Sequence, residues 1–128
     1  MQYNINTDES VNKMVQLARE SAIKYNGGDV ATEHLVYGIL RLRGSKCCDL
    51  LENFGVSLEE FEDVLNESRD DDKTPKTPDF TPKSKQVLVK AQNLAKELKS
   101  PNVSVEHILF CILMSGDCVA VGILDKVF

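Results

Sequence analysis

The chain has 128 residues, a formal net charge of −5, 27% charged residues and 42% hydrophobic residues. This length is enough for one domain with its own core. Its acidic balance, with no lysine or arginine cluster, argues against nucleic acid as a partner. No apolar run reaches the ~20 residues that a membrane helix needs, and residues 1–10 lack the basic and apolar regions of a secretory signal. We therefore expect a cytoplasmic protein with no membrane partner.

Apolar residues recur at three- and four-residue spacing in the first half of the chain, which predicts four short helices. They are expected over residues 8–25, 32–40, 46–54 and 57–65. Residues 26–28 (Asn-Gly-Gly) and 44–45 (Gly-Ser) are typical of helix ends. Polar residues that favour helix starts precede three of the four apolar stripes and are the predicted N-caps: Asp8, Thr32 and Ser57.

Residues 67–80 are charged and have no apolar period, and Pro75 and Pro78 oppose a continuing helix. We interpret this stretch as a linker. Three further helices are predicted after it, over residues 81–98, 104–114 and 117–127. For the first of them, Thr81 is the predicted N-cap and Pro82 occupies the first helical position, where a missing N–H has no cost.

The two halves of the chain align without a gap when residues 8–54 are shifted by 73 positions onto residues 81–127. The shift superposes the predicted caps and loops as well as the apolar stripes, which a shared helical period alone would not do. We infer a tandem duplication. The predicted fold is all-α: one domain, 1–128, in which two pseudo-symmetric four-helix units, repeat one (8–66) and repeat two (81–128), flank the linker 67–80. Identical pairs in the alignment are Ala18/Ala91, Ala22/Ala95, Val30/Val103, Glu33/Glu106, His34/His107, Ile39/Ile112, Leu40/Leu113 and Leu51/Leu124.

Repeat two is one helix shorter than repeat one, because the segment after Phe54 has no counterpart beyond Val127 and Phe128. Seven to eight helices are therefore expected. The shorter repeat suggests either a piece of a longer protein or a repeat that has lost its last helix.

The four cysteines and two histidines do not have the spacing of a structural zinc site. Cys47 corresponds to Ala120 and Cys111 to Gly38, so these thiols stand where the sister repeat is small. We expect reduced, buried thiols, no metal and no cofactor. For His34 and His107 we expect rings that pack in the core and are hydrogen-bonded between the repeats' own loops. A metal-dependent or enzymatic role built on these groups is the alternative that metal analysis would test.

Four stretches carry a resemblance to a known family: "ATEHLVYGIL", "LLENFGVSLEEF", "FTPKSKQVLVKAQNLAKEL" and "VSVEHILFCIL". Together they resemble the N-terminal domain of the Clp ATPases, especially the ClpC type, over the whole chain. The resemblance implies a non-catalytic domain that recruits adaptor proteins and protein substrates to an AAA+ unfoldase, which feeds a Clp peptidase. The alternative is a free-standing accessory protein that binds a Clp assembly.

The same resemblance implies recognition of arginine-phosphorylated proteins. A phosphoarginine needs a carboxylate for its guanidinium and helix-start donors for its phosphoryl group. In repeat two, Thr81 and Pro82 match the family's phosphate positions and Glu106 its guanidinium position, with Lys83 nearby to add charge. From their shared repeat, we expect Thr81 and Glu106 to form one site.

Repeat one departs from this pattern. Glu33 matches Glu106, but Asp8 stands where repeat two has Thr81. A carboxylate is a good helix cap and a poor neighbour for phosphate. The first site is therefore expected to select an unphosphorylated arginine or no ligand.

Overall fold

A computed structural model describes residues 8–26, 29–53, 55–67 and 79–115, and within them it is all-α. The six expected helices in this part of the chain are confirmed, each within two residues of its predicted bounds. The helix predicted over residues 117–127 lies outside the described residues. The six are α1 (Glu9–Asn26), α2 (Thr32–Leu40), α3 (Lys46–Asn53), α4 (Leu58–Glu67), α5 (Pro82–Glu97) and α6 (Val105–Ser115).

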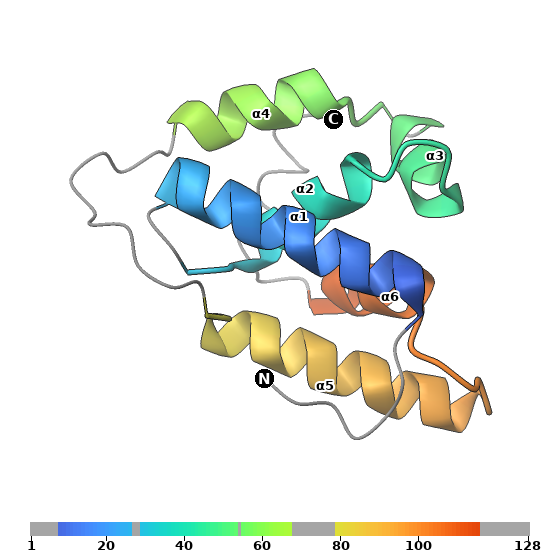
Figure 1. Cartoon of the computed structure of the whole chain (residues 1–128). Helices are drawn as coiled ribbons and strands as arrows, with labels where there is room; N and C mark the ends of the chain where they lie inside the picture. Colours follow the sequence, from blue (N-terminus) through green and yellow to red (C-terminus); the bar gives the residue numbers. More distant parts are fainter. Residues whose placement is uncertain (1–7, 27–28, 54, 68–78, 116–128) are drawn as a thin grey trace.

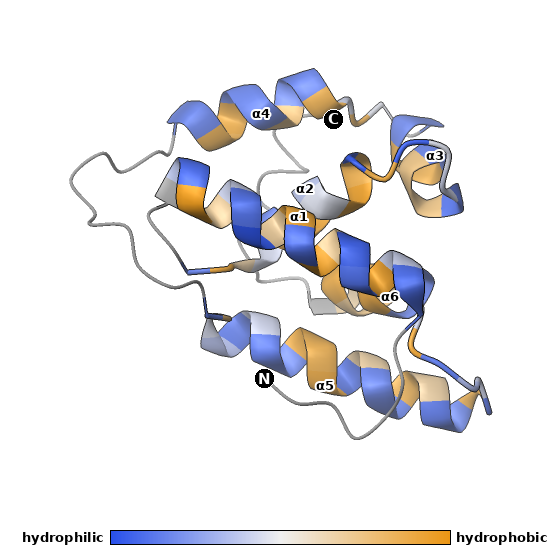
Figure 2. Ribbon diagram, viewed as in Figure 1, coloured by the Kyte–Doolittle hydropathy of each residue, from blue (hydrophilic) through white to orange (hydrophobic). Residues whose placement is uncertain are grey.

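The core is built around α2, every residue of which is buried. The closest helix pairs are α1 with α2 and α5 with α6, which are equivalent pairs under the 73-residue shift. In Figure 1, α4 and α5 lie on opposite sides of the pair formed by α1 and α2. Figure 2 shows mostly hydrophobic colour on α2 and α6, whereas α1, α4 and α5 carry long hydrophilic stripes. The helices of the described residues therefore form a two-fold repeated packing of amphipathic helices on apolar ones.

The backbones of α1 and α2 approach closely at Gly38. A Cβ atom at Gly38 would lie 2.6 Å from the backbone oxygen of Met14. In the equivalent place on α6 stands Cys111, a small side chain that is itself buried. This position therefore requires glycine in the first repeat and holds a small buried residue in the second.

The start of α2 differs from its prediction in one detail. Thr32 is the first helical residue and Ala31 is the N-cap, with φ −96° and ψ 174°. The ring of His34 reaches back, and its Nδ1 accepts a hydrogen bond from the Ala31 N–H at 2.9 Å. The prediction of Thr32 as the cap was wrong, because helical backbone already begins at Thr32 and the N-cap position falls on Ala31.

Backbone hydrogen bonds also join the two repeats to each other. Val30, before α2, forms an isolated parallel bridge with Phe80, before α5. The Thr81 N–H donates to the Val30 carbonyl at 3.0 Å, and the buried Ser84 hydroxyl donates to the same oxygen at 3.0 Å. On the other side, the Asp8 N–H donates to the Val103 carbonyl, before α6, at 3.1 Å. Each repeat's first helix therefore begins beside the second helix of the other repeat.

Candidate functional site

The start of α5 is built as predicted. Thr81 is the N-cap, and its Oγ1 accepts a hydrogen bond from the Ser84 N–H at 3.3 Å. The same hydroxyl donates to the Ser84 Oγ at 3.1 Å. Pro82 occupies the first turn and contributes no N–H, and Lys83 follows it half-buried. The positive end of the helix dipole thus lies next to a hydroxyl and a lysine, a setting that favours an anion.

The start of α2 carries Glu33, whose side chain is only 8% exposed. Burial raises the pKa of the Glu33 carboxyl from 4.5 to about 7, and a hydrogen bond from its own backbone N–H opposes part of that rise. A buried carboxyl without a cationic partner holds its proton near neutral pH. A guanidinium that reached Glu33 would therefore make the charged form favourable.

The hydrogen bonds join Thr81 to the segment that leads into Glu33. Val30, which accepts from the Thr81 N–H, is three residues before Glu33 in the chain. The prediction grouped Thr81 with Glu106, whereas this hydrogen bond brings the start of α5 to the segment that leads into Glu33. The physical reason is the bridge between Val30 and Phe80, which places the start of α5 against repeat one.

Glu106 lies at the start of α6 and is exposed. Desolvation raises the pKa of its carboxyl, but hydrogen bonds from Ser104 and from its own backbone N–H, together with the charge of Lys46, outweigh it and hold the pKa below its ordinary value. Burial, and then the Glu106 charge, raise the pKa of the Cys47 thiol to about 12. Glu106 therefore faces the first turn of α3.

Asp8, at the start of α1, lies near the segment that leads into Glu106. Its Oδ1 accepts from the Val11 N–H at 3.0 Å, which confirms it as the cap of α1. Its backbone bond to Val103 places it beside the segment that leads into Glu106. The structure thus brings two acids, Asp8 and Glu106, to one junction and places Thr81 and Glu33 at the other.

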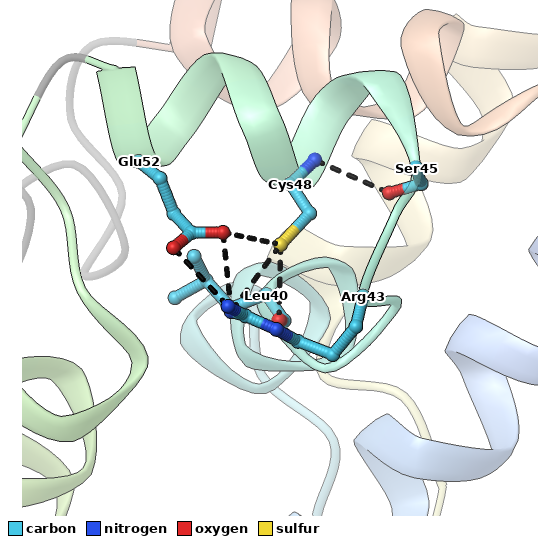
Figure 3. A network of polar contacts seen from close by, with 5 residues as sticks. All are labelled: Leu40, Arg43, Ser45, Cys48 and Glu52. Atoms are coloured by element: carbon cyan, nitrogen blue, oxygen red, sulfur yellow. Dashed lines mark hydrogen bonds and ion pairs between the residues drawn. The ribbon is translucent and has the colours of Figure 1, made fainter.

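A polar network joins α3 to the end of α2 and to Arg43 (Figure 3). Ser45 caps α3 by accepting from the Cys48 N–H at 3.2 Å. The Cys48 thiol donates to the Leu40 carbonyl at 3.3 Å, which joins α3 to the end of α2. Arg43 pairs with Glu52 at 3.2 Å. Sequence reasoning missed Lys46 and Cys47 as neighbours of Glu106, because the contact between α3 and α6 crosses the two repeats and leaves no local signal.

Both histidines serve as helix-start acceptors. His107 Nδ1 accepts from the Ser104 N–H at 2.9 Å, as His34 does from Ala31. Each of these bonds joins a ring to the helix start of its own repeat, whereas we expected bonds between the repeats' loops. His34 is buried, as expected, and His107 is half-buried. In the part of the chain that the structure describes, no three His, Cys, Asp or Glu side chains gather in a group able to hold a metal ion. The described helices also include none with the length and hydropathy needed to cross a membrane.

These features define an all-α tandem-repeat domain whose distinctive polar groups cluster at two junctions of helix starts. The family model of the Clp repeat (R) N-terminal domain matches residues 6–127, and the chain belongs to this family.

Known relatives in sequence are Clp proteins. The chain is 25% identical to the chaperone protein ClpB of Oceanobacillus iheyensis over 119 residues and 26% identical to the negative regulator of genetic competence ClpC/MecB of Bacillus subtilis over 122 residues. Each match covers 92% of this chain and 15% of the relative. The chain thus spans about 15% of the length of these curated relatives.

Solved structures show the same fold. The N-terminal domain of the chaperone ClpD from Arabidopsis thaliana matches with a TM-score of 0.75 and 19% identity, over 94% of this chain and 86% of that one. The ClpV N-domain in complex with a VipB peptide matches with a TM-score of 0.66 and 16% identity, over 91% and 79% of the two chains. At these identities the likeness concerns the fold.

Proposed function

We propose that this chain is a non-catalytic recruitment domain that docks adaptor proteins and protein substrates for a ClpC-like AAA+ unfoldase in ATP-dependent proteolysis. Membership of the Clp N-terminal family supports this proposal, and so does a fold neighbour, the ClpV N-domain, that was solved with a bound peptide. The described helix junctions offer binding groups rather than a nucleophile and base.

We further propose that phosphoarginine is recognised at the junction of α2 and α5. Glu33 would bind the guanidinium, and the start of α5, with Thr81 and Lys83, would bind the phosphoryl group. The observation that carries this assignment is the hydrogen bond from the Thr81 N–H to the Val30 carbonyl. Through this bond the N-terminus of α5, which is the positive end of its dipole, lies beside the start of α2, which carries the buried Glu33 carboxyl.

The other junction is proposed to discriminate against phosphate. There the carboxylate of Asp8 caps α1 and already accepts the Val11 N–H, in the place that Thr81 holds at the first junction. A dianionic phosphoryl group would meet a like charge at this helix start, which disfavours binding. Glu106 remains able to pair with an unphosphorylated arginine.

Calorimetric titration with free phosphoarginine tests this assignment, with free arginine as the matched ligand. We expect Glu33→Gln and Thr81→Asp to abolish saturable phosphoarginine binding, and Glu106→Gln to leave it unchanged. Asp8→Thr copies the first junction into the second and should add a second phosphoarginine site. Absence of saturable binding to the unmodified chain, or an equal loss in Glu106→Gln, would refute the assignment.

Recruitment itself is testable separately from the ligand. A chimera would carry this chain in place of the N-terminal domain of Bacillus subtilis ClpC, and degradation of an adaptor-delivered protein would be measured with its peptidase. We expect degradation above that of a ClpC lacking its N-terminal domain. Equal rates for the two would contradict the recruitment role.

A further inference from the structure

A polar cleft lies between α1 and α4, and the C-terminal end of α2 forms its floor. Its volume is about 400 Å³. Figure 1 shows α4 beside α1, and α4 packs more closely on α2 than on α1. The residues that line the cleft belong to these three helices and to the C-cap of α2: Glu20, Ser21, Lys24, Tyr37, Arg41 and Glu62.

Two cations of the cleft rest against tyrosine rings. The Lys24 Nζ lies 5.0 Å from the centre of the Tyr25 ring, and the Arg41 guanidinium carbon lies 5.8 Å from the centre of the Tyr37 ring. These rings meet edge to face with their centroids 6.0 Å apart, so they hold both cations at one surface. In the described part of the chain no carboxylate pairs with Lys24, and the pair of Arg41 with Glu20, at 3.6 Å, is exposed and contributes little. The cleft therefore offers two cations to an anionic group.

The cleft also offers hydrogen-bond acceptors. The Tyr37 hydroxyl donates to Oε1 of Glu62 at 2.9 Å, and no described residue donates to the other oxygen of that carboxylate. Ser21 is buried, and its hydroxyl donates to the Ala18 carbonyl at 2.8 Å, so the Ser21 oxygen is still able to accept. A ligand that matches both kinds of group brings an anion together with an N–H donor.

The packing of the repeat does not require these polar groups. Helices α5 and α6 pack on each other as α1 and α2 do, but the 73-residue shift gives them different residues at the positions of the cleft. These equivalents include neither a cation nor a tyrosine: Asn93, Leu94, Glu97, Phe110 and Met114. The polar groups are therefore particular to repeat one, as expected for a binding site rather than for a packing contact.

An α-carboxylate, which has an N–H group on the adjoining carbon, matches both parts of the cleft. Its oxygens would accept charge-assisted hydrogen bonds from Lys24 and Arg41, and its N–H would donate to Glu62. A side-chain carboxylate or an inorganic anion lacks this N–H and would meet the Glu62 carboxylate as an unpaired like charge.

The charge of α4 distinguishes the two sources of such a group, a free amino acid and the C-terminus of a chain. Helix α4 carries five acids and no base, and all of its acids except Glu62 are exposed. A chain that leads out of the cleft past α4 would be attracted to it by basic residues, an attraction that a free neutral amino acid lacks. The charge pattern therefore favours a C-terminus preceded by basic residues.

We propose that this cleft binds the C-terminal carboxylate of a partner chain whose preceding residues are basic. Lys24 and Arg41 bind the carboxylate, and Glu62 accepts the N–H of the terminal residue. The cleft shares no residue with the two arginine junctions. The proposal therefore goes beyond the recognition of arginine ligands and stands or fails without it.

Fluorescence anisotropy on the full chain tests this proposal with a six-residue peptide of lysine and alanine that has an N-terminal fluorophore and a free C-terminal carboxylate. We expect saturable binding, and binding at least about tenfold weaker for the same peptide with an amidated C-terminus. Lys24→Met and Arg41→Met should each weaken binding by about tenfold or more. The matched control is Lys13→Met, at another exposed lysine of α1, which should leave binding unchanged. Circular dichroism confirms that each variant is folded.

Unlabelled competitors identify the group that is bound. N-acetylalanine should displace the labelled peptide, whereas propionate, which has the same carboxylate without the N–H, should be at least about tenfold weaker. Free alanine should compete less well than the unlabelled peptide. Glu20→Gln removes the acid that pairs with Arg41 and should tighten peptide binding by about twofold or more. Lys24→Met should leave phosphoarginine titration unchanged, so this proposal and the arginine assignment are tested separately.

Four results would overturn the proposal. The first is no saturable binding of the peptide or equal binding of its amidated form. The second is a loss in Lys13→Met equal to that in Lys24→Met. The third is equal competition by propionate and N-acetylalanine, which would indicate a site for any carboxylate. The fourth is stronger competition by free alanine than by the unlabelled peptide, which would indicate a site for a free amino acid.

Discussion

Replacing Glu33 with glutamine removes a carboxyl that is 8% exposed and whose pKa burial raises from 4.5 to about 7. Because the folded pKa lies above the unfolded one, this group's contribution to stability is fully present below pH 4.5 and is lost as the pH rises to about 7. The difference between the folded and unfolded pKa values of Glu33 corresponds to at most about 3 kcal/mol in the free energy of unfolding. Glutamine stays neutral, so Glu33→Gln should be up to about 3 kcal/mol more stable than the unmodified chain at pH 8 and within about 1 kcal/mol of it at pH 5.

Urea denaturation at 25 °C, followed by far-UV circular dichroism at pH 5, 6, 7 and 8, measures these free energies of unfolding. Glu106→Gln is the matched control at the equivalent helix start. The pKa of Glu106 is lowered, so its contribution is present at neutral pH and lost on acidification. Glu106→Gln is therefore expected to destabilise the fold at pH 8, opposite in sign to Glu33→Gln.

Equal free-energy differences for Glu33→Gln at pH 5 and pH 8 would refute the reasoning, because they would show that burial does not hold the Glu33 proton. Destabilisation at pH 8 would do the same. The titration also bears on the proposed ligand. A guanidinium binds the ionised carboxylate, so phosphoarginine affinity should fall as the pH drops below about 7.

Gly38→Ala should lower the free energy of unfolding in urea by about 2 kcal/mol or more, because its Cβ would lie 2.6 Å from the backbone oxygen of Met14. Ser84→Ala should cost about 1 kcal/mol in the same assay, through loss of the buried hydrogen bond to the Val30 carbonyl. The Cys47 thiol, with a pKa of about 12, should be alkylated by iodoacetamide at pH 8 far more slowly in the native chain than in urea, as mass spectrometry would show.

The two stability predictions have control variants. Gly44→Ala has open space for its Cβ and a φ of +86°, so it measures backbone strain without a steric clash. Ser10→Ala, at an exposed residue of α1, should change stability by less than about 0.5 kcal/mol. An unchanged stability in Gly38→Ala or Ser84→Ala, or native alkylation of Cys47 as fast as in urea, would contradict the corresponding contact.

The helices and the duplication could be predicted from the sequence because their causes are local. Asp8, Ser57 and Thr81 cap their helices through hydrogen bonds to residues three positions on, and apolar spacing identifies the buried side of each helix. Such interactions depend on a few neighbouring residues, which one sequence shows directly. The start of α2 differs because the helix begins at Thr32 itself and its N-cap is Ala31, which has no side chain that can accept a hydrogen bond.

The grouping of the candidate site residues was decided by the tertiary structure. Ser84 and Val30 are 54 positions apart, and their hydrogen bond, with the adjoining bridge, assigns Thr81 to the junction that contains Glu33. The contact of Cys47 with Glu106 arises in the same way, from the packing of α3 on α6. The sequence by itself determined which helix starts carry an acid or a hydroxyl. Which of these helix starts lie side by side depends on how the similar apolar surfaces of the two repeats pack. Because both repeats carry equivalent residues, the sequence fits a pairing of helix starts within one repeat as well as a pairing across the two repeats.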